Sequence, residues 1–362
     1  MEKPLISGVL ETPLASIHLS VGAKMGVWFG CALPDDFRDA AAEYRHARES
    51  VALIDKNYRA YLAFAGPDRV RYLNAILTNN IKDLAAGQGN VSLLLNPQGH
   101  ILAEIETYAF PDKLICVSYA MIRERLIEWL DKYIIMDDVT MTDETERYGT
   151  LALEGPKAAA IVQELSGVDI APIAQLSSHD GAVGSLPCQI VKRSPDGVAG
   201  AEFVVERGRL EELWQILAEA ARKHGGGPMG YSALSALRLE QGVPWFGYDF
   251  GEKQIPHEAG LQDSHISYTK GCYTGQEIVE RVRSRGQVNR QRVQLVFSGD
   301  TSGEHVPEPG TTLTVDGKEV GSVTRAAKIW DPARIIGMAY LRREASASGS
   351  SLLWAGGIAT VA

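Results

Sequence analysis

The stretch LAFAGP at residues 62–67 returns as LALEGP at residues 151–156, and this repeat is the strongest indicator of the fold. In each copy, the segment that follows carries apolar residues at helical spacing. The pattern predicts a short buried strand, a glycine turn, a proline at the first helical position and an amphipathic helix. Two such units indicate two related α+β modules. Since strand–Gly-Pro–helix is a common arrangement, chance recurrence is the alternative to duplication.

Other regular elements are predicted around the two copies. Alternating apolar residues and turn signals indicate strands at residues 90–95, 101–108 and 113–119. Recurrence at three and four residues indicates helices at residues 126–133, 210–221 and 232–241. The second of these helices should end at the glycines of residues 225–227, because glycine is favoured just past a helix C-terminus.

The type of predicted element changes after about residue 286, from a mixture of helices and strands to strands alone. Short strand-like segments follow one another at residues 294–297, 312–315, 319–324, 335–341 and 351–361. Asp316-Gly317, between two of them, is typical of a tight hairpin turn. Short strands with turns at this spacing predict a separate all-β barrel or sandwich.

Composition limits the possible classes of protein. The 362 residues are 45% hydrophobic and carry a net charge of −9, which is ordinary for a globular protein of two or three domains and argues against one that coats nucleic acid. No apolar run approaches the roughly 18 residues that span a membrane, and the N-terminus lacks the layout of a secretion signal. Four cysteines without a CxxC pair fit a reducing compartment, and no His spacing predicts a metal site. We therefore expect a soluble cytoplasmic protein.

The segment KGCYTGQE at residues 270–277 carries the most distinctive chemistry. Thr274 and Glu277 have the spacing of a capping box, which predicts a helix beginning just after Thr274. Cys272 would then lie at the positive end of that helix, with Lys270 nearby, and its thiol would ionise readily. The alternative is a small, unreactive cysteine packed beside a glycine turn.

A run of arginines follows this segment. Five of them occur within twelve residues with no acidic residue between the first and the last, namely Arg281, Arg283, Arg285, Arg290 and Arg292. Because arginine binds carboxylates and phosphates through two parallel hydrogen bonds, the run could dock an anionic ligand or RNA. A solvated linker that leads into the β domain is the alternative.

A third set of candidates comprises residues 237–244 and the segment PHEAGL at residues 256–261, which contains Glu258. Arg238 precedes a loop that holds Trp245, Phe246 and Tyr248, and arginine beside aromatic rings suits a ligand with a planar heterocycle and an acidic tail. The alternative is a structural ion pair between Arg238 and Glu240.

KGCYTGQE together with Arg281 resembles the signature of the YgfZ-type folate-binding proteins, relatives of the T-protein (aminomethyltransferase) of the glycine cleavage system. Similarity to the T-protein extends to residues 12–18, 22–25, 230–242 and 321–324. The resemblance implies an α+β, three-domain cloverleaf around tetrahydrofolate. Its expected parts are a split folate-binding domain (1–55 and 146–285), a second α+β domain (56–145) and a C-terminal β-barrel or sandwich (286–362).

The resemblance also assigns residues. Two adjacent aspartates of the T-protein correspond to Ala103 and Glu104 here, and the loss of the first disfavours aminomethyl transfer, which needs an anion beside a developing cation. Glu202 resembles the glutamate that suits the amino-pyrimidine edge of the pterin, although the preceding loop is altered to SPDG at residues 194–197. Arg238 is expected to face the glutamate of the folate, and Glu258 stands in a T-protein-like segment.

Three functions are consistent with these features. The YgfZ-type resemblance implies a tetrahydrofolate-binding accessory protein in iron–sulfur cluster assembly or repair, in which Cys272 supplies a thiolate. Its partners would be assembly factors or client enzymes, which in that family include radical enzymes that modify tRNA. The alternative is a tetrahydrofolate-dependent aminomethyl or one-carbon transferase, with Glu104 replacing the missing aspartate. The third is a folate- or RNA-binding module without chemistry, although we expect no direct contact with nucleic acid or membrane.

Overall fold

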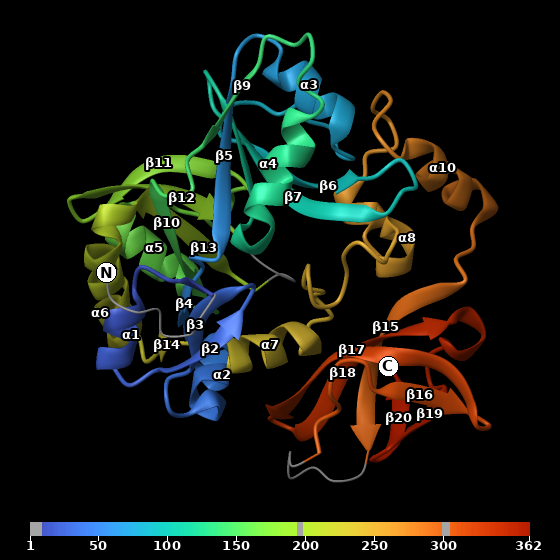
Figure 1. Cartoon of the computed structure of the whole chain (residues 1–362). Coiled ribbons are helices and arrows are strands. Elements are labelled where there is room, and N and C mark those ends of the chain that lie inside the picture. Colours follow the sequence, from blue (N-terminus) through green and yellow to red (C-terminus); the bar gives the residue numbers. More distant parts are fainter. Residues whose placement is uncertain (1–8, 194–197, 299–304) are drawn as a thin grey trace. The chain divides into compact units, whose positions relative to one another are not determined.

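The structure is a computed structural model, and it describes residues 9–193, 198–298 and 305–362 (Figure 1). The chain divides into two compact units. The first comprises residues 1–74, 80–92 and 105–233, and the second comprises residues 75–79, 93–104 and 234–362. The three domain ranges expected from the sequence stay a prediction.

A six-stranded sheet forms the largest part of the first unit. Its strands, in spatial order, are β11 (Ser178–Val183), β12 (Leu186–Lys192), β13 (Gly200–Glu206), β10 (Tyr148–Glu154), β4 (Ala52–Asp55) and β14 (Gly227–Pro228). All pairs are antiparallel except β4 with β14. Helices α5 (Ala158–Ser166) and α6 (Leu210–Lys223) cover one face, where Phe203, Leu213 and Trp214 share a buried core.

A five-stranded sheet has the order β6 (Gly89–Leu95), β7 (Ile101–Ala109), β8 (Leu114–Tyr119), β5 (Arg59–Ala65) and β9 (Thr140–Asp143). The helices α3 (Arg69–Ile76) and α4 (Arg123–Asp131) accompany it. Phe64 of β5 stacks on Tyr72 of α3, whose hydroxyl donates a hydrogen bond to the carbonyl of Leu130 in α4. These contacts join both helices to one face of the sheet.

Near the N-terminus a smaller, three-stranded sheet has the order β1 (Leu10–Glu11), β3 (Cys31–Asp36) and β2 (Lys24–Trp28), with the helices α1 (Ala15–Ser20) and α2 (Ala40–Glu49). Single 3₁₀ turns occur at Ala120–Ile122, Arg207–Arg209 and Arg343–Ala345.

The repeated segment has the predicted order of elements. Strand β5 leads through Gly66 and Pro67 into α3, and strand β10 leads through Gly155 and Pro156 into α5. Both glycines have positive φ, +99° and +139° respectively, and an added Cβ would lie only 2.3 Å and 2.5 Å from a backbone oxygen. The prediction that proline opens each helix is wrong, because both prolines lie in the turn and the helix begins two residues later. The backbone N–H groups of Arg69 and Ala158 donate to the carbonyls of Gly66 and Gly155, so each proline lies inside a closed turn.

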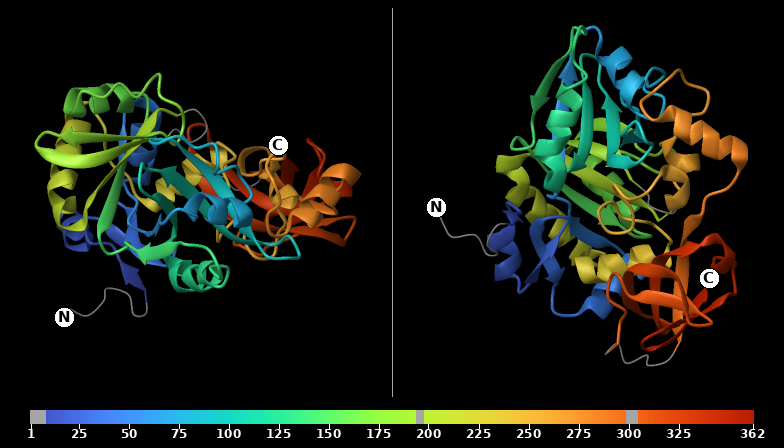
Figure 2. Two further views of the ribbon diagram at one scale, coloured as in Figure 1. Left: turned by 90° about the horizontal axis from the view of Figure 1, so that it is seen from above. Right: turned by 45° about the vertical axis from the view of Figure 1, so that its right-hand side comes forward.

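The second unit contains a closed barrel, which Figure 2 shows from two further directions. Its strands, in order around the barrel, are β15 (Arg290–Ser298), β18 (Ala333–Arg342), β17 (Lys318–Trp330), β16 (Thr312–Val315), β19 (Ser351–Trp354) and β20 (Gly357–Val361). Asp316 and Gly317 form the predicted hairpin turn with φ of 51° and 72°. The single strand predicted at 351–361 is instead the hairpin β19–β20.

Four helices lie between β14 and β15 in sequence: α7 (Tyr231–Glu240), α8 (Pro256–Ala259), α9 (Gln262–His265) and α10 (Gln276–Arg285). The remaining predicted strands and helices overlap the observed ones, although β17 continues to Trp330, well beyond its predicted end at residue 324. The predicted fold class, α+β with a C-terminal β-barrel, is confirmed. Among the described residues, no helix has the length and apolar character needed to cross a membrane.

Candidate functional site

A cavity of about 210 Å³ lies in the first unit, between strands of the six-stranded and the five-stranded sheets. Alternation along β13 explains its position, because neighbouring residues of a strand point to opposite faces. Ala201, Phe203 and Val205 face the core beneath α5 and α6, whereas Glu202 and Val204 face the cavity. One short strand therefore supplies both the packing of the unit and the carboxylate of the site.

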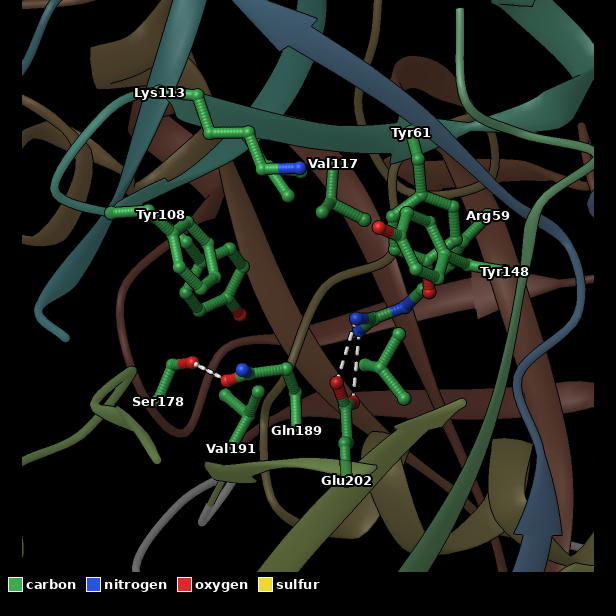
Figure 3. A pocket seen from close by; sticks show the side chains of 13 residues that line it. Arg59, Tyr61, Tyr108, Lys113, Val117, Tyr148, Ser178, Gln189, Val191 and Glu202 are labelled. Atoms are coloured by element: carbon green, nitrogen blue, oxygen red, sulfur yellow. Dashed lines mark hydrogen bonds and ion pairs between the residues drawn. The ribbon is translucent and has the colours of Figure 1, made fainter. Parts of the chain in front are cut away.

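Aromatic, aliphatic and polar side chains share the cavity wall, and three tyrosine rings are visible in it (Figure 3). The five-stranded sheet and its β7–β8 turn contribute Arg59, Tyr61, Tyr108, Phe110, Lys113, Ile115 and Val117. The six-stranded sheet contributes Tyr148, Ser178, Gln189, Val191, Glu202 and Val204. Flat rings with a few polar groups are typical of sites for small planar ligands.

Two arginines and two glutamates form a charged cluster at this cavity, in which the side chain of Arg193 is the most exposed. Nη1 and Nη2 of Arg59 donate to the two carboxylate oxygens of Glu202 over 2.6 and 2.8 Å. Nη1 also lies 3.6 Å from Oε2 of Glu106, and Arg193 lies 2.6 Å from the other oxygen of Glu106. Burial alone would raise the pKa of Glu106, but the guanidinium groups of Arg193 and Arg59 lower it to about 2. The carboxyl group of Glu106 is therefore ionised at neutral pH and carries the negative charge that these two guanidinium groups face.

Glu202 was expected to bind a ligand, and it does line the cavity. The altered loop at residues 194–197, which precedes it, lies outside the described residues. Sequence reasoning missed Arg59 and Glu106. Period-two alternation through β5 and β7 could have indicated which side chains share a face, but not which sheet that face meets.

The KGCYTGQE segment lies in the second unit, and it contains the exposed thiol of Cys272. The predicted capping box is wrong, since α10 begins at Gln276 with Gly275 as the N-cap residue and without a side-chain cap. Gly275 has φ +83°, and an added Cβ would lie 2.7 Å from the carbonyl oxygen of Asn96. The loop therefore closes on a left-handed glycine, and Glu277 instead pairs with Arg281.

Lys270 points toward backbone carbonyls. Its Nζ donates to the carbonyl oxygens of Leu77 and Asn79, and it lies 5.2 Å from the ring centroid of Tyr273. Burial lowers the pKa of Lys270 to about 8. The described contacts give this ammonium a role in joining the KGCYTGQE segment to residues 77–79, and its predicted action on the thiol of Cys272 stays a prediction.

Glu104 belongs to the same unit and is linked to the same segment of chain. Its Oε1 lies 2.9 Å from Nε2 of His265, and the carbonyl of His265 accepts a hydrogen bond from the hydroxyl of Thr78. Thr78 lies between the two carbonyls that Lys270 contacts. The structure thus brings Glu104, His265 and Lys270 into one network, while Ala103 is fully buried.

Arg238 is 2% exposed and donates to the side chain of Gln241. The aromatic loop that follows α7 is also packed inside, because the guanidinium of Arg325 lies 4.1 Å from the ring centroid of Trp245 and pairs with Asp249. Of the three aromatic residues expected to suit a planar ligand, only Tyr248 is partly exposed, and the expected role of Arg238 toward a folate stays a prediction. Trp245 and Phe246 have core positions, and arginine covers the indole ring.

Glu258 and the arginine run have structural contacts. Glu258 lies at the start of α8, where its side chain accepts from the backbone of Ile255, and it pairs with Arg290 over 3.1 Å. Arg292 donates to the carbonyl of Ala259. The run is thus divided between helix α10, where Arg281 and Arg283 are exposed, and strand β15. The contacts of Arg290 and Arg292 favour a structural role for the second half of the run over a docking strip.

Within residues 9–193, 198–298 and 305–362, no group of three or more His, Cys, Asp or Glu side chains is placed to hold a metal ion.

Comparison with known proteins agrees with this architecture. The GCVT N-terminal domain family matches residues 14–265, well over half of the chain. The chain belongs to the GCVT family. Its relatives include the aminomethyltransferase of Streptomyces avermitilis, 26% identical over 342 residues that cover 94% of this chain and 91% of that protein. The aminomethyltransferase of Herpetosiphon aurantiacus is 29% identical over 316 residues, which cover 87% and 85% of the two chains.

Among solved structures, the glycine cleavage system aminomethyltransferase T from Bartonella henselae has the same fold. It superposes with a TM-score of 0.85, covers 98% of this GCVT-family chain and 96% of its own, and is 22% identical. The T-protein-like fold expected from the sequence is thereby confirmed.

Proposed function

We propose that this GCVT-family protein binds tetrahydrofolate and takes part in one-carbon transfer of the aminomethyltransferase type. One observation carries the proposal: the cavity of the first unit combines aromatic walls with the buried carboxylate of Glu202. Relatives named aminomethyltransferase, aligned over most of both chains, support the same class of reaction.

The cavity suits one end of such a ligand. Its volume of about 210 Å³ is below the roughly 300–1,000 Å³ of a complete small-molecule site, so it matches a single ring system. Tyr61, Tyr108 and Tyr148 offer ring faces, and Glu202 offers two oxygens to a pair of N–H donors. Tetrahydrofolate, when bound, would accept the one-carbon unit. Glu202 and the aromatic rings would hold and orient its pterin end.

Glu104 is proposed as the carboxylate that stabilises positive charge during transfer. Its hydrogen bond with His265 fixes the direction of the carboxylate and gives it a partner that holds or donates a proton. A glutamate is one methylene longer than the aspartate of the T-protein, and a fixed partner restricts its additional rotamers. Charge stabilisation of this kind depends on such prior orientation.

A paired experiment tests the proposal. Tetrahydrofolate is titrated by calorimetry into the wild type, Glu202→Gln and the control Glu206→Gln, which alters the exposed end of the same strand. We expect affinity to fall about ten-fold or more in Glu202→Gln alone, because a hydrogen bond to a charged group is lost. One-carbon transfer from an aminomethyl carrier-protein donor is then assayed. Binding without turnover would reject the transferase function, and absence of binding would reject both parts.

A second candidate function is a YgfZ-type role in iron–sulfur cluster assembly or repair, which the exposed thiol of Cys272 favours. Its support is the KGCYTGQE motif and the accessibility of this sulfur, since a thiolate must reach its target to act as a nucleophile or ligand. Cys272→Ala should then abolish complementation of a cluster-dependent enzyme in cells and leave tetrahydrofolate affinity unchanged. Equal complementation by the variant would reject this role.

A further inference from the structure

Arg59 already occupies the carboxylate that the proposed ligand needs. The two parallel hydrogen bonds of 2.6 and 2.8 Å form a fork-to-fork pair, the geometry in which a guanidinium and a carboxylate match best (Figure 3). The side chains of Arg59 and Glu202 are only 8% and 2% exposed. A ligand therefore forms the same two-donor fork with Glu202 only after the guanidinium has moved.

The carboxylate of Glu106 can pair with the guanidinium of Arg59 when it leaves Glu202. Oε2 of Glu106 lies 3.6 Å from Nη1 of Arg59, and Glu106 is itself held by Arg193 and by the hydroxyl of Tyr108. A buried charge left without a partner is strongly destabilising. Since Glu106 is in reach, Arg59 can release Glu202 without becoming such a charge.

We propose that Arg59 is the specificity-determining residue of this cavity: it admits to Glu202 only a ligand that offers the same two parallel N–H donors as its own guanidinium. The chemical class is a cyclic guanidine, a ring N–H beside an amino group, and the 2-amino-4-oxopyrimidine edge of a reduced pterin belongs to it. The inference rests on the proposed function and adds to it the group that the ligand must replace. A flat ring without these donors cannot replace the two hydrogen bonds between Arg59 and Glu202, so the pair stays intact and the ring does not bind.

The first test measures how much the pairing of Arg59 with Glu202 weakens tetrahydrofolate binding. Arg59→Met removes the guanidinium and keeps most of the side-chain length, so Glu202 becomes free. We expect tetrahydrofolate affinity, measured by calorimetry, to rise about ten-fold or more. The control Arg209→Met removes a guanidinium that pairs with Glu212 on the exposed surface and leaves the residues of the cavity unchanged, so its affinity should not rise. An affinity of Arg59→Met equal to or below that of the wild type overturns the inference.

The second test needs no folate. Free guanidinium ion at low millimolar concentration should refill the vacated place in Arg59→Met and raise its Tm relative to an equal concentration of sodium, because a ligand of the native state stabilises it. Wild type and the double variant R59M/E202Q should show no such increase. Equal shifts in all three proteins would mean that no guanidinium-shaped site exists, and the inference would fall.

The two tests separate the inference from the proposed function. Stabilisation of Arg59→Met by guanidinium, with no tetrahydrofolate binding to any variant, overturns the proposed function and supports the role of Arg59. Tetrahydrofolate binding of equal strength to wild type and Arg59→Met supports folate binding and overturns the role of Arg59. If Arg59→Met does not fold, Arg59→Lys replaces it in the calorimetric arm, since an ammonium keeps the charge and cannot form the fork. Unchanged or weaker affinity of Arg59→Lys then overturns the inference.

Discussion

The imidazole of His265 bridges Glu104 and Ser264: Nε2 lies 2.9 Å from Oε1 of Glu104, and Nδ1 lies 2.7 Å from the hydroxyl of Ser264. Both ring nitrogens are thus engaged, so the ring is fixed in position and its tautomer is tied to the hydroxyl orientation of Ser264. The side chain of His265 is 10% exposed. A carboxylate held in this way has a defined direction before any substrate arrives.

Substitution of Glu104 should affect turnover more than binding. If one-carbon transfer occurs, Glu104→Gln should lower kcat about 100-fold, since the charge that stabilises the transition state is lost. His265→Gln should lower kcat about ten-fold, because it loosens the carboxylate without removing it. Initial rates with saturating tetrahydrofolate measure both effects. Glu128→Gln on the exposed side of α4 is the control, and full activity of Glu104→Gln would exclude Glu104 from the reaction.

The four cysteines should differ sharply in reactivity toward a thiol reagent. Cys272 is exposed, whereas Cys31, Cys116 and Cys188 are buried. Burial raises the pKa of Cys31 and Cys116 to about 12 and that of Cys188 to about 11, so these thiols are neutral as well as covered. Labelling at pH 8 should modify one thiol rapidly in the native protein and all four in urea. Cys272→Ser should abolish the rapid phase, and a rapid phase that persists would contradict the assignment.

Asp55 should make the stability of the fold sensitive to acid. Its buried carboxylate accepts from Nε2 of His18 at 2.7 Å, from the hydroxyl of Thr12 at 2.5 Å and from the backbone of Asn57. Burial alone would raise the pKa of Asp55, but these hydrogen bonds and the charge of His18 lower it. A lowered pKa means that this stabilisation is complete above the ordinary value near 3.8 and is lost as pH falls through the folded-state pKa.

Urea unfolding of Asp55→Asn measures this contribution. We expect a loss of about 3 kcal/mol near pH 7, because a buried charged network loses its acceptor, and a smaller acid dependence than in the wild type. Asp39→Asn, which keeps a good N-cap on α2, is the control. An unchanged acid dependence in Asp55→Asn would show that other carboxyl groups determine it.

Gly155 should tolerate no side chain. With φ at +139° and the carbonyl oxygen of Ser50 2.5 Å from an added Cβ, Gly155→Ala combines backbone strain with a steric clash. We expect a loss of about 2 kcal/mol or more in the free energy of unfolding. Gly167 also has positive φ, +74°, but nothing lies within 4 Å of an added Cβ, so Gly167→Ala should cost only about 1 kcal/mol. Equal losses in the two variants would contradict the steric argument.

Local sequence patterns predicted most of the elements, because side-chain alternation and turn residues act between neighbours in the sequence. Alternation identifies β6, β7 and β8 within two residues, and Asp316-Gly317 forms its hairpin turn because both residues adopt positive φ readily. The helix starts were less accurate. The prolines of the two repeats and Thr274 of the KGCYTGQE segment have the right local chemistry, but the turn geometry places the first helical residue further along the chain.

The cavity could not be predicted in the same way. Arg59 and Glu202 are 143 residues apart in sequence, and their pairing depends on which faces of two sheets meet. Resemblance indicated Glu202, but no local pattern indicated that Arg59 pairs with its carboxylate. The buried position of Trp245 was missed for a similar reason, because Arg325, which covers its ring, belongs to a strand of the barrel.

The barrel has one consequence for the behaviour of the protein at high concentration. Every one of its strands is hydrogen-bonded on both sides, since β15 pairs with β20 as well as with β18. An open sheet presents unsatisfied backbone groups on which a strand from a neighbouring molecule can add, and this is a common start of aggregation. In the closed barrel these backbone groups are hydrogen-bonded to neighbouring strands. Molecules that crowd together during synthesis therefore find no open edge for strand addition along these six strands.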